Sequence, residues 1–126
     1  MKVYFAHSMI HYGSGDEKIA LMFLRKRFET VIDPNKDMGE QGDIVPYLAK
    51  ITECDAVCVM EYEGFVGKGV FSEVKFALLC KKPVYAMRNN KLYIVKSVKV
   101  YDSTDWKIAY GKIKIGKEYL CKSTRV

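Results

Sequence analysis

Glu61 and Glu73 are the two carboxylates of this 126-residue sequence whose positions best suit chemistry on a bound molecule. Glu73 follows the glycine-broken segment GFVGKG, residues 64–69, and is expected in the first turn of a helix. A helix N-terminus stabilises an ionised carboxylate, and displacement at a sugar carbon needs one because its transition state resembles an oxocarbenium cation. The alternative is that Glu73 only complements the helix dipole. The glycine spacing matches neither a Walker loop nor a dinucleotide fingerprint.

Elements that would position these carboxylates alternate between strand and helix over residues 1–88. Apolar runs predict strands at 2–8, 30–33, 55–61 and 83–87, and helical spacing predicts helices at 16–29, 43–54 and 70–82. Asp43 is the expected N-cap of the second helix, with Pro46 in its first turn. Such alternation predicts an α/β fold with a mostly parallel sheet covered on both faces.

The loops that follow the strands of such a sheet converge at its carboxyl edge, where ligands bind. Two unusual loops meet this description, residues 7–15 after the first strand and 61–69 after the third. Their polar residues and Glu73 would face one cleft. In the third helix, Phe71, Val74 and Leu78 are expected to form the core stripe, with Glu73 at its flank.

The loop YGSGDEK, residues 12–18, is rich in small residues before the first helix. Its backbone amides could cradle a phosphate at the helix N-terminus. Because Asp16 and Glu17 would repel an anion, we favour a flexible loop in which Ser14 or Asp16 caps the helix.

The pattern changes after Arg88. Asn89 and Asn90 predict a tight hairpin turn, and apolar residues then alternate with lysine as in antiparallel strands with one basic face. Residues 1–90 carry 12 basic and 12 acidic side chains, whereas residues 91–126 carry 9 and 3. We therefore expect a single domain over 1–126, with an α/β core at 1–88 and a basic antiparallel β extension at 89–126.

This basic extension leaves a nucleic-acid interaction open. Its lysines alternate with Tyr93, Tyr101 and Tyr110, and lysine stripes with exposed aromatic rings can follow a phosphate backbone and stack on bases. A solvated strand face has the same composition, and strand lysines prevent edge-to-edge aggregation, so we favour that interpretation.

Cysteine, histidine and hydropathy patterns give no sign of a metal, a cofactor or a membrane. The four cysteines form no CxxC pair and are expected to be buried and reduced, and His7 and His11 are expected to be ordinary polar loop residues. No run of about 18 apolar residues is present, and the first residues resemble a strand rather than a signal peptide. We therefore expect a cytoplasmic protein without a membrane partner.

Three segments of the core resemble the nucleoside 2-deoxyribosyltransferase-like superfamily, which includes nucleoside 5′-monophosphate N-glycosidases. They are the first strand, VYFAHSM, the third strand, DAVCVME, and the segment GKGVFSEVKFALLCKKPVY. The last one is similar to the family's Gly-Thr-x-x-Glu helix start, followed by a Lys-Pro-Val strand. The resemblance covers residues 1 to about 88. It implies a flavodoxin-like three-layer sandwich, a nucleoside or nucleotide substrate, no cofactor and a homo-oligomer.

The same resemblance implies roles for particular residues. Glu73 corresponds to the nucleophile that forms a glycosyl-enzyme intermediate, and Gly69 to the loop glycine four residues before it. Glu61 stands where the family places a carboxylate near the nucleobase, suited to protonating or orienting the leaving base. A strand-end residue facing water is the alternative for Glu61. The sugar pocket would be lined by Ala6, His7, Ser8 and Met9.

Departures from the family pattern leave the activity open. Gly67 stands where transferases commonly have an aspartate, and Val70 replaces the family threonine. Lys68 and Ser72 could hold a phosphate, as in the 5′-monophosphate glycosidases. The sequence thus predicts cleavage or transfer of an N-glycosidic bond, with a non-catalytic nucleotide sensor of the same fold as the alternative.

Overall fold

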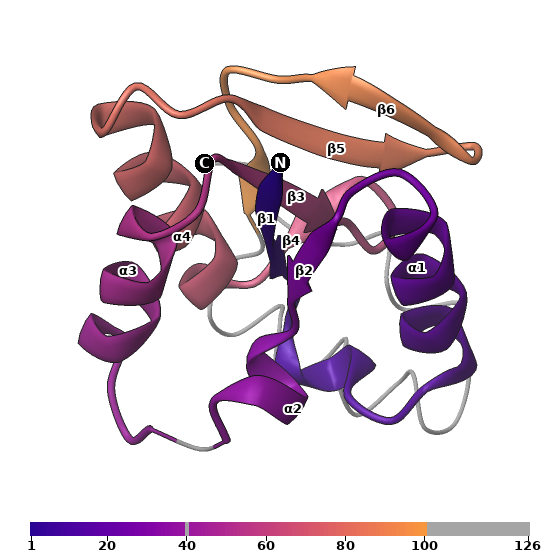
Figure 1. Ribbon diagram of the computed structural model, residues 1–126, viewed down its shortest axis with the longest axis horizontal. Helices are drawn as coiled ribbons and strands as arrows, with labels where there is room; N and C mark the ends of the chain where they lie inside the picture. Colours follow the sequence, from indigo (N-terminus) through magenta and orange to yellow (C-terminus); the bar gives the residue numbers. More distant parts are fainter. Residues whose placement is uncertain (40, 101–126) are drawn as a thin grey trace.

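The computed structural model describes residues 1–39 and 41–100, shown in Figure 1. The strands are β1 (Lys2–Ala6), β2 (Thr30–Ile32), β3 (Ala56–Met60), β4 (Phe65–Val66), β5 (Val84–Arg88), β6 (Lys91–Ile94) and β7 (Lys99–Val100). The α-helices are α1 (Gly15–Arg25), α2 (Pro34–Asp37), α3 (Val45–Thr52) and α4 (Lys68–Leu79), and a 3-10 turn spans Met9–His11. The strands expected after residue 100 lie outside the described residues.

The main sheet has five strands in the order β2-β1-β3-β5-β6. The pairs β1–β2, β1–β3 and β3–β5 are parallel, and β5–β6 is antiparallel. The predicted α/β fold with a mostly parallel sheet is therefore confirmed.

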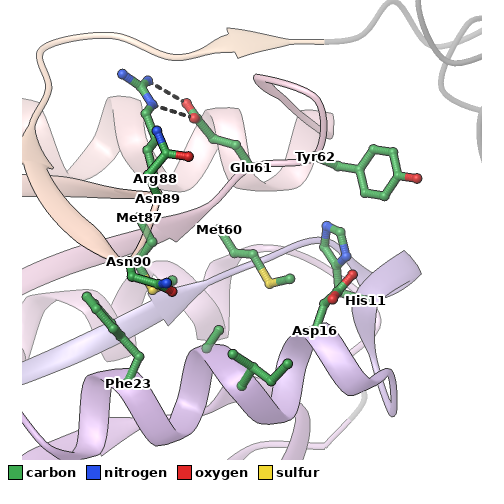
Figure 2. Close-up of a pocket in the computed structure, with 12 residues that line it drawn as sticks. His11, Asp16, Phe23, Met60, Glu61, Tyr62, Met87, Arg88, Asn89 and Asn90 are labelled. Atoms are coloured by element: carbon green, nitrogen blue, oxygen red, sulfur yellow. Dashed lines mark hydrogen bonds and ion pairs between the residues drawn. The ribbon is translucent and has the colours of Figure 1, made fainter.

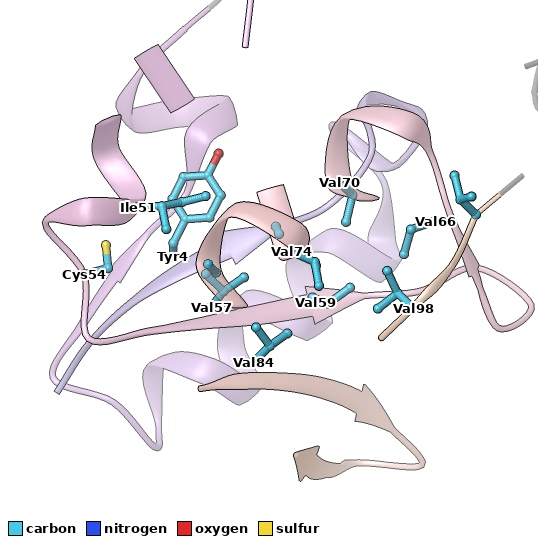
Figure 3. Packing of buried hydrophobic residues seen from close by; sticks show 13 residues of the cluster. Tyr4, Ile51, Cys54, Val57, Val59, Val66, Val70, Val74, Val84 and Val98 are labelled. Atoms are coloured by element: carbon cyan, nitrogen blue, oxygen red, sulfur yellow. The ribbon is translucent and has the colours of Figure 1, made fainter. Parts of the chain in front are cut away.

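Helices cover both faces of this sheet, with α3 and α4 on one side and α1 on the other (Figure 1). The α3/α4 side buries Tyr4, Ile51 and a set of valines, seen from close by in Figure 3. The α1 side buries Phe5, Leu24 and their neighbours. Successive residues of β1 point to opposite faces, so Tyr4 and Phe5 enter different clusters.

Helix α4 begins two residues earlier than predicted, and this changes the position of Glu73. Gly67 is the N-cap, so Glu73 is the sixth helical residue and lies beyond the first turn. The buried face of the helix consists of Val70, Glu73, Val74 and Ala77. The expected stripe was wrong in placing Glu73 at the flank: Val74 is buried as expected, but Phe71 and Leu78 are only partly buried and Glu73 lies on the buried face.

The segment after β5 partly follows the prediction. Asn89 and Asn90 have φ angles of 52° and 59°, which confirms the tight hairpin turn into β6. Strand β7 contradicts the expectation of antiparallel pairing, because it pairs in parallel with β4. Val98 and Val100 are buried, so this pairing completes the core on the α3/α4 side.

Smaller differences concern caps and thiols. Ser14 accepts a hydrogen bond from the Glu17 N–H and caps α1 as predicted, whereas Ile44 rather than Asp43 is the N-cap of α3. Cys54 and Cys58 are buried free thiols, but Cys80 is exposed, contrary to prediction, and Cys121 lies outside the described residues. Within residues 1–39 and 41–100, no helix is both long and apolar enough to span a membrane.

Candidate functional site

Glu73 forms a buried pair with Tyr4 across the interface between α4 and the sheet. The Tyr4 hydroxyl donates a short hydrogen bond to Glu73 Oε2, and only 7% of Glu73 is exposed. Tyr4 belongs to β1 and is fully buried, so the sheet fixes its ring and directs its hydroxyl at the carboxylate. A neutral donor from a rigid strand therefore orients the candidate nucleophile.

Burial sets the ionisation of this pair. Burial raises the pKa of Glu73 to about 7, and the hydrogen bond from Tyr4 lowers it only in part. The pKa of Tyr4 is also raised, first by burial and then by the Glu73 charge. The expectation that Glu73 lies in the first turn, where the helix N-terminus would stabilise its ionised form, was wrong, because Glu73 is the sixth residue of α4. Near pH 7 it exists in both protonation states.

A second buried polar cluster joins the carboxyl ends of β1 and β2 to α1. His7 Nε2 lies 2.7 Å from Glu17 Oε2 and 3.9 Å from Asp33 Oδ1. His7 Nδ1 lies 3.0 Å from the Phe5 carbonyl oxygen, and since a carbonyl only accepts, Nδ1 carries a hydrogen. His7 is therefore a buried cluster residue and not the ordinary loop residue that was expected, whereas its place in a sugar pocket stays a prediction.

Neighbouring amides complete the surroundings of the two carboxylates. Gly13 N–H and the Asn35 side chain donate to Glu17, and Asn35 N–H donates to Asp33 Oδ1. Burial raises the pKa of Glu17, but the bonds from His7, Gly13 and Asn35 outweigh it, and the net pKa is lowered. The pKa of Asp33 is raised, first of all by burial. Sequence analysis missed both carboxylates as site residues.

The remaining residues expected around the sugar lie in different surroundings. Ala6 is fully buried in the core, and Met9 is 69% exposed. Ser8 is buried, and its Oγ accepts a hydrogen bond of 3.2 Å from the Gly67 N–H. This bond joins the loop after β1 to the start of α4, so the two predicted loops do meet at the carboxyl edge of the sheet.

Three of the expected substrate-binding residues lie at the start of α4 and are exposed: Lys68 and Ser72, expected to hold phosphate, and the loop glycine Gly69. Lys68 and Gly69 are its first two residues, and Ser72 precedes Glu73. A Cβ atom built on Gly69 would meet no atom within 4 Å, so no neighbour requires glycine there. The structure leaves all three free to contact a ligand from solvent.

Glu61 is held by Arg88 instead of facing water. Arg88 Nε and an Nη donate to the two carboxylate oxygens at 2.7 and 2.8 Å (Figure 2). The side chain of Glu61 is 5% exposed and that of Arg88 is 47% exposed. Both oxygens of Glu61 accept hydrogen bonds from Arg88. Glu61 could therefore protonate a nucleobase only after its ion pair with Arg88 breaks.

This ion pair borders a cavity of about 250 Å³ on the α1 side of the sheet. Met60, Met87 and Phe23 supply apolar surface, and Arg88 and Asn90 add polar groups, as Figure 2 shows. A second hollow of about 400 Å³ lies between Arg88 and the segment 95–99. Glu73 lines neither of these two cavities.

Comparison with known proteins adds no family assignment: no protein-family model, curated protein or solved structure matches this chain.

Proposed function

We propose that this protein cleaves or transfers the N-glycosidic bond of a nucleoside or nucleoside 5′-monophosphate, with Glu73 as the nucleophile. The observation that carries the proposal is the buried Tyr4–Glu73 pair. The strand order β2-β1-β3-β5-β6 is compatible with the flavodoxin-like layout that the sequence resemblance implies.

The chemistry follows from the properties of the pair. The ionised Glu73 attacks C1′ of the sugar, and the C1′–N bond breaks with its electron pair leaving on the base, which takes up a proton. Water or a second base then displaces Glu73 from C1′, which regenerates the carboxylate. Tyr4 holds one carboxylate oxygen and leaves the other for attack. A pKa near 7 keeps a sizeable ionised fraction at neutral pH and makes the carboxylate a better nucleophile than an ordinary one.

Only 7% of Glu73 is exposed, so a substrate reaches it only if neighbouring residues move. The Ser8–Gly67 hydrogen bond joins the loop after β1 to the start of α4. Tyr12 lies on the same loop, and its pKa is raised first by burial, then by Tyr47 and then by the charge of Glu73. Lys68 and Ser72, exposed at the start of α4, would meet the 5′-phosphate of a nucleotide.

The test is to incubate the protein with a panel of ribo- and deoxyribonucleosides and their 5′-monophosphates and to measure free base by chromatography. The proposal expects the parent to release base and Glu73→Gln to release none. Ser72→Ala is a folded control that is expected to lower turnover of the 5′-monophosphates but not of the nucleosides. Equal turnover by Glu73→Gln and the parent would overturn the assignment of the nucleophile.

A non-catalytic nucleotide sensor is the second candidate, and the cavity beside Glu61 and Arg88 favours it. A volume of about 250 Å³ with Met60, Met87 and Phe23 as apolar surface suits a nucleobase, and Arg88 offers a charge for phosphate. This candidate expects nucleotides to raise the melting temperature without base release, and the Arg88→Gln variant to lose that effect. Accumulation of free base would exclude it.

A further inference from the structure

We infer that His7, Glu17 and Asp33 form a binding site for a divalent transition-metal cation of the zinc class. One ligand atom from each residue lies within 4.8 Å of the other two, and all three side chains are buried. The cation would join the ends of β1 and β2 to the first turn of α1. This site is separate from Glu73, so its test does not depend on the proposed glycosidase function.

The hydrogen bonding of His7 points to a cation between the imidazole and the carboxylates. Nδ1 carries its hydrogen toward the Phe5 carbonyl, so Nε2 of a neutral ring presents a lone pair to Glu17 Oε2, 2.7 Å away. Two electron pairs at that distance repel unless a proton or a metal ion lies between them. A backbone carbonyl that accepts from the other ring nitrogen is also the usual support of a metal-binding histidine.

Asp33 supplies an independent observation. It is fully buried, its Oδ1 faces His7 Nε2 at 3.9 Å, and its Oδ2 has no hydrogen-bond partner among the described residues. A buried carboxylate oxygen without a partner is costly, and a metal ion bound by both oxygens of Asp33 would satisfy Oδ2 as well as Oδ1. The position of Asp33 beside His7 thus indicates a third ligand.

Charge balance supports a divalent ion over a proton. Within residues 1–39 and 41–100, no lysine or arginine pairs with Glu17 or Asp33. With a proton on His7, two ionised carboxylates leave one negative charge buried and uncompensated. A divalent cation with a neutral imidazole balances both carboxylates.

The spacing of the ligand atoms needs only a small adjustment. Tetrahedral bonds of about 2.1 Å to nitrogen and oxygen place two ligand atoms roughly 3.4 Å apart. The observed separations from His7 Nε2, 2.7 Å to Glu17 and 3.9 Å to Asp33, lie on either side of that value. The imidazole ligand and the two carboxylates favour zinc, cobalt or manganese over magnesium, which prefers oxygen ligands alone.

The experiment uses the full chain after chelation and dialysis, titrated with Zn²⁺ by calorimetry and with Co²⁺ by visible absorption. We expect one equivalent of each metal to bind, without a thiolate-to-cobalt charge-transfer band, and Asp33→Asn to weaken binding about 100-fold. Asparagine can still accept from the Asn35 N–H, so the cap of α2 survives. Asp16→Asn, an exposed neighbour, and Cys80→Ser are the controls that keep parental affinity.

A readout on the parent chain covers the case in which Asp33→Asn does not fold. Zn²⁺ is expected to shift the NMR resonance of His7 Nε2 selectively, with Nδ1 still protonated. Absence of metal binding, undiminished binding by folded Asp33→Asn, thiolate ligation of cobalt, or an unchanged His7 Nε2 resonance would each overturn the proposal.

Discussion

Glu73 and Glu17 are both buried glutamates on helices that follow sheet strands, yet the pKa of Glu73 is raised and that of Glu17 is lowered. Among residues 1–39 and 41–100, Glu73 accepts a hydrogen bond only from the neutral Tyr4 hydroxyl, and burial raises its pKa to about 7. Glu17 has the His7 ring, the Gly13 amide and the Asn35 side chain around it, and its pKa is lowered. Burial alone does not set the charge of a carboxylate, because the number and charge of its donors decide the outcome.

Position in the helix adds to this difference. Glu17 is the third residue of α1, within the first turn, where the helix dipole stabilises a negative charge. Glu73 is the sixth residue of α4 and faces the apolar side of the sheet. Glu17 thus suits a permanent charge that holds structure or a cation, and Glu73 suits a group that changes protonation near neutral pH.

The largest expected difference between the two glutamates is in the effect of a glutamine substitution on the free energy of unfolding. In metal-free buffer at pH 7, Glu17→Gln is expected to lower the free energy of unfolding by about 3 kcal/mol, because it removes the charged partner of buried His7. Glu73→Gln should be neutral or slightly stabilising, since it replaces a carboxylate whose charge burial disfavours. Urea denaturation measures both, and equal effects of the two substitutions would refute the comparison.

The pH dependence of stability should also have opposite signs. Between pH 4.5 and about 7, folded Glu73 binds more proton than the unfolded chain, so its contribution to the free energy of unfolding falls by about 3 kcal/mol as pH rises. The contribution of Glu17 is present above pH 4.5 and is lost as pH falls through its lowered folded pKa. Denaturation at several pH values should show a decline toward pH 7 that disappears in Glu73→Gln. A decline that persists unchanged would assign it to another group.

Tyr4→Phe tests whether the Tyr4 hydroxyl sets the pKa of Glu73. The change removes the hydrogen bond that partly lowers the pKa of Glu73, so this pKa rises further. We expect base release at pH 7 to fall about 10-fold and the midpoint of its pH profile to move upward. Tyr85→Phe, on another strand, is the matched control. A Tyr4→Phe variant with an unmoved profile would show that Tyr4 does not act through Glu73.

Breaking the Glu61–Arg88 pair is expected to have the smallest destabilising effect on the free energy of unfolding. Because Arg88 is about half exposed and a glutamine amide can still donate to the nearly buried Glu61 side chain, Arg88→Gln should lower the free energy of unfolding by about 1 kcal/mol. If Glu61 orients the leaving base, Glu61→Gln lowers base release while stability stays close to that of the parent. A loss of several kcal/mol in Arg88→Gln would show that the pair is a structural element instead.

Much of the fold could be predicted because the sequence patterns are strong. Continuous apolar runs such as AVCVM identify parallel strands buried on both faces, and Asn89–Asn90 supplies the left-handed residues that a hairpin turn needs. The parallel pairing of β7 with β4 could not be predicted. Each strand has two residues, so neither carries a period, and their pairing depends on burial of Val98 and Val100 by distant parts of the chain.

The candidate site was predicted less completely, for a related reason. The meeting of the two loops followed from sequence, whereas the role of Glu73 stays a prediction. The partners of Glu73 and His7 depend on which face each side chain points to. Tyr4 looked like one more strand residue, and Asp33 looked like the residue before a strand-ending proline. Because β1 and β2 are neighbours in the sheet, His7 and Asp33, which follow these strands, lie at the same edge. Knowing the strand order would therefore have predicted that they lie close together.

Whether Glu73 forms a covalent bond to the sugar can be read from the intact mass of the protein, quenched during turnover of the substrate found in the panel. The account predicts a fraction of the parent heavier by the sugar unit, with the label mapped by peptide sequencing to Glu73, and no such species in Glu73→Gln. Base release accompanied by a label on another residue, or by an equal label in Glu73→Gln, would contradict it.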